Sequence, residues 1–590
     1  MKNRMVRPLF ALHSDDLLYD NSNWFSEIRQ WIFFDVYMAQ NMSDSFIQYF
    51  ERSFKQNWDS RFLYNYSTQV GYSYGVVAKE IAKMHLLFER LGITREDKIA
   101  VVGPNSMEWA VSFLSVITYG AVAVPIQEDF HPDVIEEILN HSESKMLFIS
   151  DANWERLRSE NIQRIDTVFS FSQIKEMRQL RGERGEEALR EIDRLFEQRY
   201  PNGFQSQDVR FSDKGDDEVL VLIYTSGTTG FTKGVMLSGG NFRCVVDFLR
   251  HSIAAGPGDK VISFLPLAHG MALMNDLFLP VVLGAYIVYL YKVPSLKVLI
   301  KAMQEVKPEW TSMVPMFFEA IYKKHALPSL KKKHIQILYR LPLLSRIVCS
   351  KLKKRVMEAY GGHIKLMYVG GAGLNHEVED FYHKIGFPYA VGYGMTECSP
   401  LVSLVYKHPK PHAVGKAIDQ VTVKINSSDP YAEAGEILVK GPNVMKGYYK
   451  NEEVTRSVFT EDGWLKTGDV GILDADDFLY IKGRTKNMIL TSTGQNIYPE
   501  EIEDRLNQQP IVAESLVVLR GENRLVALVY PNYPNIGEDV DPQRVAEMME
   551  DMRHKVNRNL ASYEYLSAIE VQAEPFEKTA KKSIKRFRYQ

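Results

Sequence analysis

The residues best suited to chemistry on phosphate lie in one short stretch, residues 224–234, which reads Tyr-Thr-Ser-Gly-Thr-Thr-Gly-Phe-Thr-Lys-Gly. It contains four threonines, one serine, three glycines and one lysine, and no acid. Glycine lets backbone N–H groups turn toward an anion, hydroxyl groups add donors, and lysine supplies the positive charge that a polyphosphate needs. We therefore predict a phosphate-binding loop, with a threonine-rich polar turn as the alternative.

The flanking residues predict that this loop joins two strands. The apolar run 219–223 before it reads as a buried strand, and residues 235–237 behind it read as a second short strand. A Walker P-loop would need glycine directly before the lysine and a helix after it, but Thr232 precedes Lys233. The predicted phosphate ligands are Thr225, Ser226, Gly227, Thr228, Thr229, Gly230 and Lys233, of which Thr225 and Lys233 are also candidates for catalysis.

Length and composition describe a large globular protein. The chain has 590 residues, 45% of them hydrophobic and 25% charged, so it can bury a sizeable core and hold several domains. The net charge of -3 gives no whole-chain argument for nucleic acid binding. The three cysteines, Cys244, Cys349 and Cys398, are scattered and lack metal-ligand spacing, which indicates a reducing compartment without a disulfide framework.

No segment reads as a signal peptide or a membrane-spanning helix. The longest apolar run, residues 277–291, is 15 residues long and contains Pro280 and Gly284, so it is too short to span a bilayer and predicts a core helix or strand. Asp15 and Asp16 interrupt the N-terminal segment before any apolar core of a signal peptide. We therefore expect a cytoplasmic protein.

The order of strand-like and helix-like segments predicts an α/β fold. Helices alternate with the short apolar strands 98–103, 121–125 and 146–149, which is typical of a mostly parallel sheet. Residues 176–200 read as a charged, exposed helix. Residues 264–269 read as a strand ending at His269, and a lone histidine is more often a hydrogen-bonded core residue than a functional one.

Further motifs follow the loop along the chain. Residues 369–373 (Val-Gly-Gly-Ala-Gly) and 392–397 (Gly-Tyr-Gly-Met-Thr-Glu) are glycine clusters, and residues 464–469 (Trp-Leu-Lys-Thr-Gly-Asp) and 483–489 (Gly-Arg-Thr-Lys-Asn-Met-Ile) come after them. Glycine permits a flat base to lie against the backbone, and Tyr393 offers the other stacking face. The carboxylate of Glu397 is suited to holding Mg²⁺ on phosphate oxygens.

In this order the loop and the motifs resemble those of the adenylate-forming (AMP-binding) enzymes, which include acyl-CoA synthetases, luciferases and the adenylation domains of peptide synthetases. The resemblance runs from about Met42 to the C-terminus. Thr232 is a departure, because the family usually has proline there, and proline only stiffens the turn. The sequence of residues 392–397 and the basic stretch described below most resemble those of the long-chain fatty acid–CoA ligases.

The resemblance implies roles for single residues. The residues that it places around the nucleotide, besides the loop, are Gly371, Ala372, Gly373, Tyr393, Gly394, Thr396, Asp469 and Arg484. It implies that Glu397 is catalytic and binds Mg²⁺ together with Thr225, and that His269 lies on the wall of the acyl pocket. Lys486 takes the family's hinge position, and Gly494 takes the position past which the pantetheine arm of CoA runs.

The implied fold is α/β, with a large N-terminal domain of mixed and parallel sheets with helices and a small, mobile C-terminal α/β domain. We predict an N-terminal extension at residues 1–41, the adenylating domain at residues 42–485 and the cap domain at residues 486–590. Residues 42–47 have an N-cap pattern that leads into a helix. Pro499, followed by Glu500 and Glu501, predicts another helix start, which makes these two acids structural.

The implied activity joins a carboxylic acid to a thiol at the expense of ATP. The acid, a long-chain fatty acid in the branch that this chain resembles, attacks the α-phosphorus of ATP, and CoA then displaces AMP from the acyl-AMP. The implied partners are therefore this acid, ATP, Mg²⁺ and CoA, with no nucleic acid. Two alternatives stay open: an enzyme that loads an acyl carrier protein, and a catalytically weakened nucleotide-binding relative.

The C-terminal residues depart from the family where a catalytic lysine is expected. The usual ending, Thr-x-x-Gly-Lys-Ile-x-Arg, has a lysine directly before the isoleucine, whereas Ser583 precedes Ile584 here. Lys582 lies one residue earlier, and a side chain of four carbons can cover one residue of chain, ~3.5 Å. We predict Lys582 as the catalytic cation, with Lys581 and Lys585 as neighbouring candidates.

Residues 320–357 form the most basic stretch of the chain. They include eleven Lys and Arg residues and no acid, with apolar residues interleaved. Such a pattern is typical of a solvated helical face or of a basic amphipathic surface that binds anionic lipid, which would make the protein peripheral to a membrane. The sequence favours neither interpretation over the other.

Overall fold

The computed structural model describes residues 44–171, 178–226, 232–252, 255–291, 294–405, 410–490, 496–521, 524–537, 540–578 and 584–589. The chain divides into two compact units, Met1–Ser45 and Phe46–Gln590, and every helix and strand described below lies in the second. The predicted N-terminal extension, residues 1–41, lies outside the described residues.

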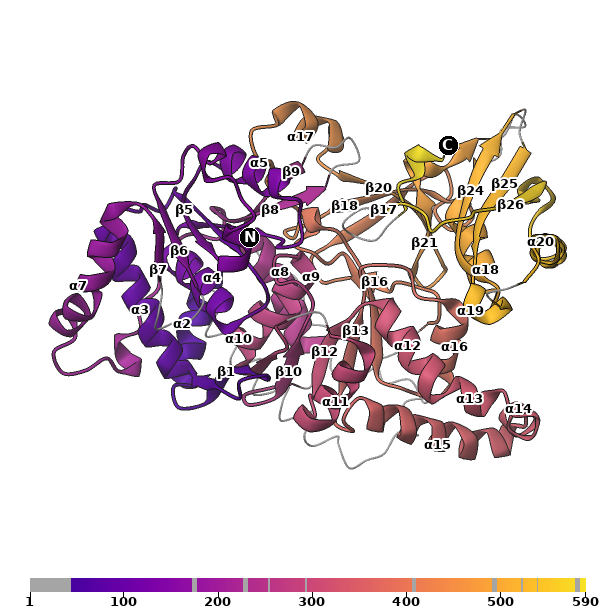
Figure 1. The fold of residues 1–590 in the computed structure, drawn as a ribbon, viewed down its shortest axis with the longest axis horizontal. Helices are drawn as coiled ribbons and strands as arrows, with labels where there is room; N and C mark the ends of the chain where they lie inside the picture. Colours follow the sequence, from indigo (N-terminus) through magenta and orange to yellow (C-terminus); the bar gives the residue numbers. More distant parts are fainter. Residues whose placement is uncertain are drawn as a thin grey trace, which may run out of the picture. The chain divides into compact units, whose positions relative to one another are not determined.

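One large sheet has nine strands in the order β16-β15-β14-β13-β12-β10-β11-β1-β2 (Figure 1). In that order the strands are Lys416–Ala417, Ser403–Leu404, Tyr389–Tyr393, Leu366–Val369, Trp310–Met313, Lys260–Ser263, Tyr286–Tyr289, Arg61–Asn65 and Gly71–Ser73. The strands from β14 to β1 run parallel to their neighbours, and antiparallel strands flank them at both edges.

A second sheet has eight strands in the order β19-β9-β8-β4-β3-β5-β6-β7. These strands are Gly447–Tyr448, Thr232–Ser238, Val219–Ser226, Val122–Ile126, Lys98–Val102, Ser144–Ile149, Thr167–Ser170 and Arg178–Arg181. The predicted strands β3, β4 and β5 pair in parallel, and β8 and β9 form the predicted antiparallel hairpin. The mixed, mostly parallel α/β architecture is thus confirmed.

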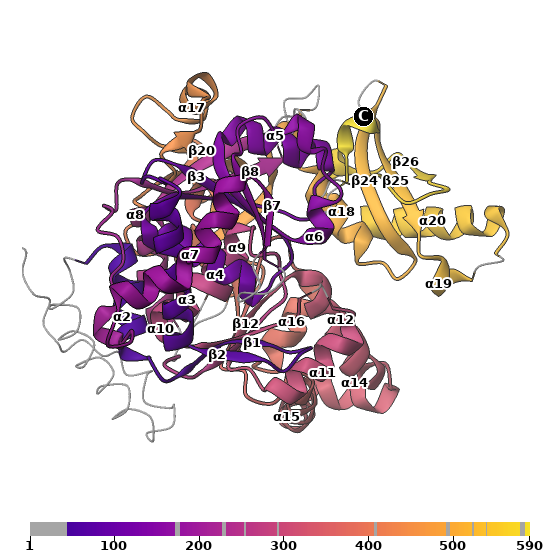
Figure 2. The same cartoon turned by 60° about the vertical axis from the view of Figure 1, so that its left-hand side comes forward.

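Helices connect these strands, as expected where parallel strands need crossovers. They are α2 (Phe46–Gln56), α3 (Tyr74–Arg90), α4 (Met107–Tyr119), α5 (Pro132–Ser142), α6 (Asp151–Trp154), α7 (Glu183–Arg199), α8 (Gly239–Ser252), α9 (Gly270–Leu273), α10 (Leu279–Leu283), α11 (Leu296–Val306), α12 (Pro315–His325), α13 (Leu327–Leu330), α14 (Lys333–Arg340), α15 (Pro342–Ala359) and α16 (His376–Lys384). Local chemistry sets their ends: the hydroxyl of Ser106 accepts from the Trp109 N–H at the start of α4, and Gly120 ends that helix at φ 94°. Figure 2 shows α2, α3 and α4 packed together beside these sheets.

One local prediction is right in part and another is wrong. The charged segment 176–200 contains the predicted helix, α7, but a strand, β7, precedes it, and α7 lies against α3 through the ion pairs Lys83–Asp193 and Arg199–Glu89. Residues 264–269 are not a strand, because β10 ends at Ser263 and His269 caps α9. In both places, tertiary contacts outweigh the local pattern.

Four antiparallel strands continue the chain and lead to the C-terminal part. They are β17 (Thr422–Asn426), β18 (Gly435–Lys440), β20 (Leu465–Leu473) and β21 (Leu479–Arg484), in the order β17-β18-β20-β21, with α17 (Glu452–Val458) between β19 and β20. The last part contains β22 (Ile489–Leu490), β23 (Asn496–Ile497), α18 (Pro499–Asn507), β24 (Val512–Arg520), β25 (Arg524–Pro531), α19 (Tyr533–Ile536), α20 (Pro542–Asn557) and β26 (Ala568–Val571). Helices α18 and α20 share an apolar core with β24 and β25, so this part has a core of its own. Pro499 occupies the first turn of α18, as predicted.

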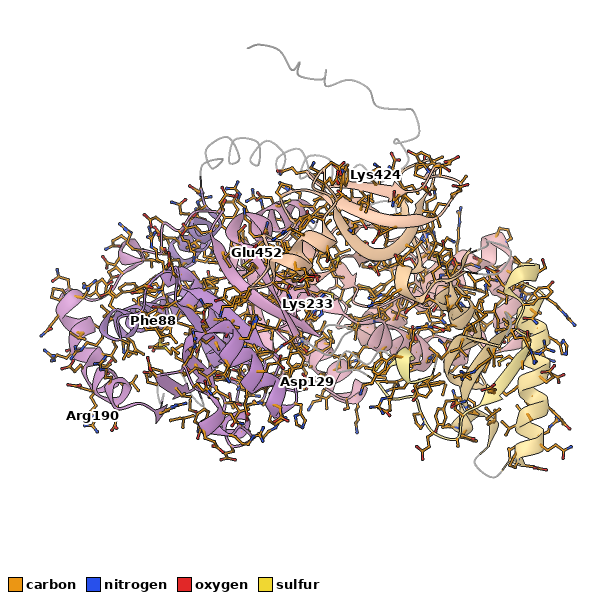
Figure 3. All side chains as sticks on the ribbon, turned by 90° about the horizontal axis from the view of Figure 1, so that it is seen from above. Phe88, Asp129, Arg190, Lys233, Lys424 and Glu452 are labelled. Atoms are coloured by element: carbon orange, nitrogen blue, oxygen red, sulfur yellow. The ribbon has the colours of Figure 1, made fainter. Side chains whose placement is uncertain are left out.

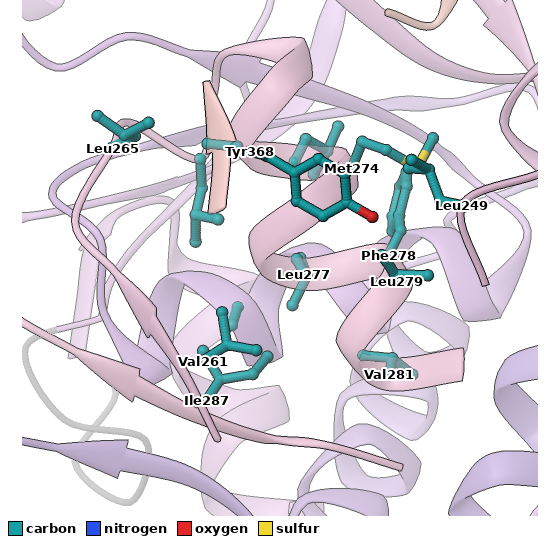
Figure 4. Close-up of a cluster of buried hydrophobic side chains, with 14 of the residues drawn as sticks. Leu249, Val261, Leu265, Met274, Leu277, Phe278, Leu279, Val281, Ile287 and Tyr368 are labelled. Carbon is teal, nitrogen blue, oxygen red and sulfur yellow. The ribbon is translucent and has the colours of Figure 1, made fainter. Parts of the chain in front are cut away.

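Most of the segment after His269 is buried. A π-helical turn, η4 (Met274–Phe278), leads into α10, and their side chains pack with those of β10 and β11 (Figure 4). The predicted core run 277–291 is therefore both helix and strand. Among the residues that the structure describes, no helix combines the length and apolar character needed to cross a membrane.

One acid sits inside this core. Asp276, on η4, is fully buried, and neither of its carboxyl oxygens has a hydrogen-bond partner among the described residues. Burial raises the pKa of Asp276 well above its ordinary value, and the nearby hydroxyl of Ser312 offsets only part of this effect. Burial therefore favours the protonated, neutral form of this side chain.

We expect Asp276→Asn to change how stability depends on pH. Folded Asp276 keeps its proton above about pH 4, whereas the unfolded chain releases it, so the free energy of unfolding falls as pH rises. Asparagine removes this slope, so the melting temperature of the variant relative to the parent should rise as the pH increases above about 4. The matched control is Asp129→Asn at an exposed position (Figure 3). Parallel pH curves for the parent and Asp276→Asn would contradict the assignment.

Candidate active site

The hairpin β8–β9 positions the predicted phosphate loop. Thr225 pairs with Lys233, and Ser226 pairs with Thr232, so the two strands close a turn of five residues, 227–231. The predicted ligands Gly227, Thr228, Thr229 and Gly230 lie in that turn, outside the described residues. Lys233 is the second residue of β9 (Figure 3), and its ammonium lies 5.1 Å from the centroid of the Tyr448 ring.

Tyr448 links Lys233 to the predicted metal ligand. Its hydroxyl donates a hydrogen bond of 2.8 Å to Oε1 of Glu397, which is 8% exposed. Burial and the Glu397 carboxylate raise the pKa of Tyr448, so the phenol remains a donor. Strand β19 holds it there by pairing with β9, and the Met445 N–H donates to the Glu397 carbonyl over 2.9 Å. Sequence reasoning missed Tyr448, which lies outside the recognised motifs.

Three of the residues predicted to surround the nucleotide contact one another. The Tyr393 hydroxyl donates a hydrogen bond of 2.8 Å to Oδ2 of Asp469, and Nε of Arg484 lies 3.2 Å from Oδ1. Pairing of β20 with β21 sets Asp469 opposite Arg484. Burial raises the pKa of Asp469, which the Arg484 guanidinium partly offsets. The structure thus joins an aromatic ring, a carboxylate and a cation that the sequence places up to about 90 residues apart.

Lys486 brings another positive charge to this place. It lies in a single 3-10 turn, Thr485–Asn487, directly after β21. Burial lowers the pKa of Lys486, and the charges of Arg484 and Lys233 lower it further. Lys486 therefore lies close enough to Arg484 and to Lys233 for their like charges to repel it, which is an arrangement that an anionic ligand such as a polyphosphate would relieve.

The segment around Lys486, the predicted hinge, is tied to α18. Nδ2 of Asn487 donates to Oε1 of Glu500 over 2.6 Å, and Nζ of Lys482 lies 2.8 Å from Oε1 of Glu501. Both acids lie in the first turn of α18, as predicted, but they also bind side chains of the segment that precedes that helix. Gly494 lies outside the described residues.

The glycine turns and the His269 turn pack together. A Cβ on Gly394 would lie 1.8 Å from the Pro400 carbonyl oxygen, so only glycine fits there. Gly371 has a φ of +85° and, with Ala372 and Gly373, is exposed after β13. Cβ positions built on Gly270 and Gly370 would contact Pro400 and Met271, at 3.3 Å and 3.2 Å respectively.

His269 is half-buried beside these glycines. Its Nδ1 accepts a hydrogen bond of 3.4 Å from the Met271 N–H, which caps α9. Nδ1 therefore has a structural role as the cap of α9. The predicted position of His269 on the wall of an acyl pocket stays a prediction. Thr396 is buried in the 3-10 turn Thr396–Cys398, next to Glu397.

The C-terminal residues hold the loop predicted to carry the catalytic lysine. Lys578 and Ile584 form a β-bridge around residues 579–583, so Lys581, Lys582 and Ser583 lie in that loop, outside the described residues. Arg586 anchors the far side through an ion pair with Glu503 of α18, and burial raises the pKa of Glu503 to about 7. Lys585 lies 3.6 Å from Glu577 and is thus engaged elsewhere.

The donors at Glu397 fit a magnesium ion that arrives with phosphate. Within the described ranges, no group of three or more His, Cys, Asp or Glu side chains is arranged to hold a metal by protein groups alone. Mg²⁺ commonly uses one or two carboxylates together with substrate phosphates and water. The Glu397 carboxylate, with Oε1 oriented by Tyr448, and the half-buried Thr225 across the hairpin are compatible with that pattern.

Comparison with known proteins agrees with this geometry. Residues 50–449 match the AMP-binding enzyme family, and residues 486–589 match the AMP-binding enzyme C-terminal domain. The chain is 29% identical over 467 residues to a long-chain-fatty-acid–CoA ligase, FadD15, of Mycobacterium bovis, covering 75% of this chain and 74% of that protein. It is 25% identical over 550 residues to a chloroplastic long-chain-fatty-acid–[acyl-carrier-protein] ligase, AEE15, of Arabidopsis thaliana, covering 80% and 74%.

Solved structures share the fold. One is o-succinylbenzoate coenzyme A synthetase, MenE, of Bacillus subtilis in complex with ATP and magnesium ion. It aligns with a TM-score of 0.69 at 22% identity and covers 91% of this chain and 98% of its own. At that identity the likeness concerns the fold alone.

We expect Tyr448→Phe to lower the rate of acyl-adenylate formation about tenfold, because a hydrogen bond to a charged group contributes roughly 1.5–3 kcal/mol and here orients Glu397. The half-saturating Mg²⁺ concentration should rise in the same variant. Tyr449→Phe is the matched control, since the hydroxyl of Tyr449 donates instead to Glu143. In a Glu397→Gln background, which alone should cost roughly 10²-fold or more, the Tyr448 change should have little further effect. Full additivity of the two changes would overturn the assignment of Tyr448 as a positioning residue.

Proposed function

Because this chain belongs to the AMP-binding, adenylate-forming enzyme family, we propose that it is an ATP-dependent fatty acid–CoA ligase. It activates a long-chain fatty acid as acyl-AMP with release of pyrophosphate, and it transfers the acyl group to CoA with release of AMP. The acid and CoA are the substrates, ATP is consumed, and Mg²⁺ accompanies ATP.

The observation that carries the proposal is the convergence of Lys233, Arg484 and Lys486 beside the Tyr393–Asp469 pair. Asp469 can accept hydrogen bonds from both ribose hydroxyls, while Tyr393 presents a ring to the base. A triphosphate attached to that nucleoside would supply the negative charge that these cations attract. A site for ATP therefore accounts for all five side chains together.

In the first half-reaction, a carboxylate oxygen of the acid forms a bond to the α-phosphorus, and the bond from this phosphorus to the bridging oxygen of pyrophosphate breaks. Negative charge accumulates on the phosphoryl oxygens, so fixed donors and cations lower the barrier. Lys233 and the loop residues bind the phosphates, and Lys582 approaches from the C-terminal loop. When bound at Glu397 and Thr225, Mg²⁺ neutralises phosphate charge.

In the second half-reaction, the thiol of CoA attacks the acyl carbon, the thiol proton is released, and the carbon–oxygen bond to AMP breaks. The turn at Lys486 changes conformation between the two steps, so that the C-terminal part presents Gly494 to the pantetheine arm. Exclusion of water at each step protects the acyl-AMP from hydrolysis.

The fatty acid assignment is supported by relatives and by the apolar segment beside His269. FadD15 is named as a long-chain-fatty-acid–CoA ligase. Here η4 and α10, which follow His269, are buried and largely apolar, as a wall for an alkyl chain requires. Two observations favour other candidates. The likeness to AEE15 favours a ligase that loads a carrier protein. The absence of the usual lysine at Ser583 favours a weakened nucleotide-binding relative.

Product release distinguishes these candidates. With ATP, Mg²⁺ and fatty acids of graded chain length, we expect pyrophosphate release that depends on the acid, and AMP release that depends on CoA and is greatest for long chains. AMP release that responds to an acyl carrier protein and not to CoA would assign the first alternative. ATP binding without acid-dependent turnover would assign the second and overturn the proposal.

Among the C-terminal lysines, we expect Lys582→Ala to reduce single-turnover acyl-AMP formation on the order of 10²-fold. Lys585→Ala is the matched control, because Lys585 already pairs with Glu577 and should change the rate less than about threefold. A normal rate for Lys582→Ala with a loss in Lys581→Ala would move the role to Lys581. Normal rates in all three variants would exclude a lysine mechanism.

A further inference from the structure

The basic stretch 320–357 forms a group of helices, α12 to α15, that the proposed chemistry does not use. Helices α14 and α15 lie side by side, and both views show them next to each other (Figures 1 and 2). None of the α14 residues is buried. This helical hairpin is therefore exposed along much of its length.

Large apolar side chains gather at the end of this hairpin. Of the twelve large apolar side chains that stand exposed among the described residues, four lie within residues 337–347. They are Ile337, Leu341, Leu344 and Ile347, exposed by 61%, 45%, 41% and 56%. Single exposed apolar residues need no explanation, but a cluster of this kind marks an interaction surface.

Helix α15 has one buried face and one exposed face. Val348, Leu352 and Val356 are buried against the protein core. Leu344, Ile347, Lys351 and Lys354 follow one another at spacings of three and four residues, so they share the opposite, exposed face. Along this exposed face, the two apolar side chains come first and the two lysines follow, and the next residue at this spacing is Glu358.

Positive charge surrounds the apolar cluster. Lys331, Lys332 and Lys333 are exposed immediately before and at the start of α14, and Arg340 and Arg346 are exposed beside Leu341 and Leu344. Among the described residues, the ion pair found for the eleven basic side chains of this stretch is Lys323 with Glu319, at 3.7 Å. Most of the charge is therefore available to a negatively charged partner.

We propose that α14 and α15 form a docking surface for a membrane rich in anionic lipid. Lysines and arginines bind the headgroups, and the four aliphatic side chains, called here the apolar tip (Ile337, Leu341, Leu344 and Ile347), enter the region between headgroups and acyl chains. An acidic protein would match the charge, but it would leave an aliphatic tip of this exposure without a partner. Basic residues around exposed aliphatic side chains are the combination that interfacial membrane binding requires.

The surface is independent of the proposed catalysis, so binding can be measured without substrate. The probe is co-sedimentation of the full chain with vesicles of phosphatidylcholine alone or mixed about 3:1 with phosphatidylglycerol. We expect binding to the anionic vesicles, weak binding to the neutral ones, and loss of binding as salt rises. Equal binding to both vesicle types, or binding to an acidic carrier protein but not to vesicles, would overturn the proposal.

Two variants test the two parts of the surface. Replacing Lys331, Lys332 and Lys333 together with Gln should lower the partition coefficient on the order of 100-fold, because each basic residue near an anionic surface contributes about fivefold. Replacing Ile337 and Ile347 with Ser should weaken binding without changing its salt dependence. The matched control is Arg190→Gln with Arg194→Gln on the exposed α7 (Figure 3), which should bind as the parent does.

The variants also distinguish a local effect from misfolding. Each should keep the parent's melting temperature and its acid-dependent pyrophosphate release on a short-chain, water-soluble acid. Folded variants of both kinds that bind anionic vesicles as tightly as the parent does would overturn the proposal.

Discussion

The site depends on repulsion between like charges that the fold holds together. Lys233 is the second residue of β9, Arg484 ends β21, and Lys486 lies two residues further on. Burial lowers the pKa of Lys486, and the charges of Arg484 and Lys233 lower it further. Lys233 and Arg484 each have one compensating contact, the ring of Tyr448 and the carboxylate of Asp469 respectively. The remaining positive potential is the physical reason why an anionic nucleotide fits this place.

The sheets account for how these groups meet. Hairpin β8–β9 presents Lys233, strand β19 adds Tyr448 to the edge of that hairpin, and the pairing of β20 with β21 sets Asp469 opposite Arg484. Tyr448 and Arg484 end their strands, Lys233 is the second residue of β9, and Asp469 lies within β20, so main-chain pairing fixes where each side chain starts. The C-terminal part meets the same region through the segment at Lys486, the predicted hinge, where Asn487 is bound to Glu500. A conformational change at the proposed hinge would therefore alter the surroundings of Lys486 and the position of α18 together.

Much of the fold and site could be predicted from sequence, for identifiable reasons. Strands β3, β4, β5, β8 and β9 are short apolar runs bounded by turn residues, so their pattern is local. Tyr393, Asp469 and Arg484 stand in motifs with unusual composition, and the structure brings them together. The sequence pattern predicts a strand that ends at His269, whereas His269 caps α9, because pairing with β11 ends β10 at Ser263. Tyr448 and Asp276 had no local signal, since their roles depend on partners at Glu397 and in the core.

The central claim is that a carboxylate attacks the α-phosphorus of ATP at this site and that a thiol then attacks the acyl carbon. The most direct test uses a long-chain fatty acid labelled with ¹⁸O in both carboxylate oxygens, with ATP, Mg²⁺ and CoA, followed by mass spectrometry of the products. The account predicts one ¹⁸O atom in each AMP released, none in pyrophosphate, and one retained in the thioester. Unlabelled AMP, or label in pyrophosphate or inorganic phosphate, would contradict it.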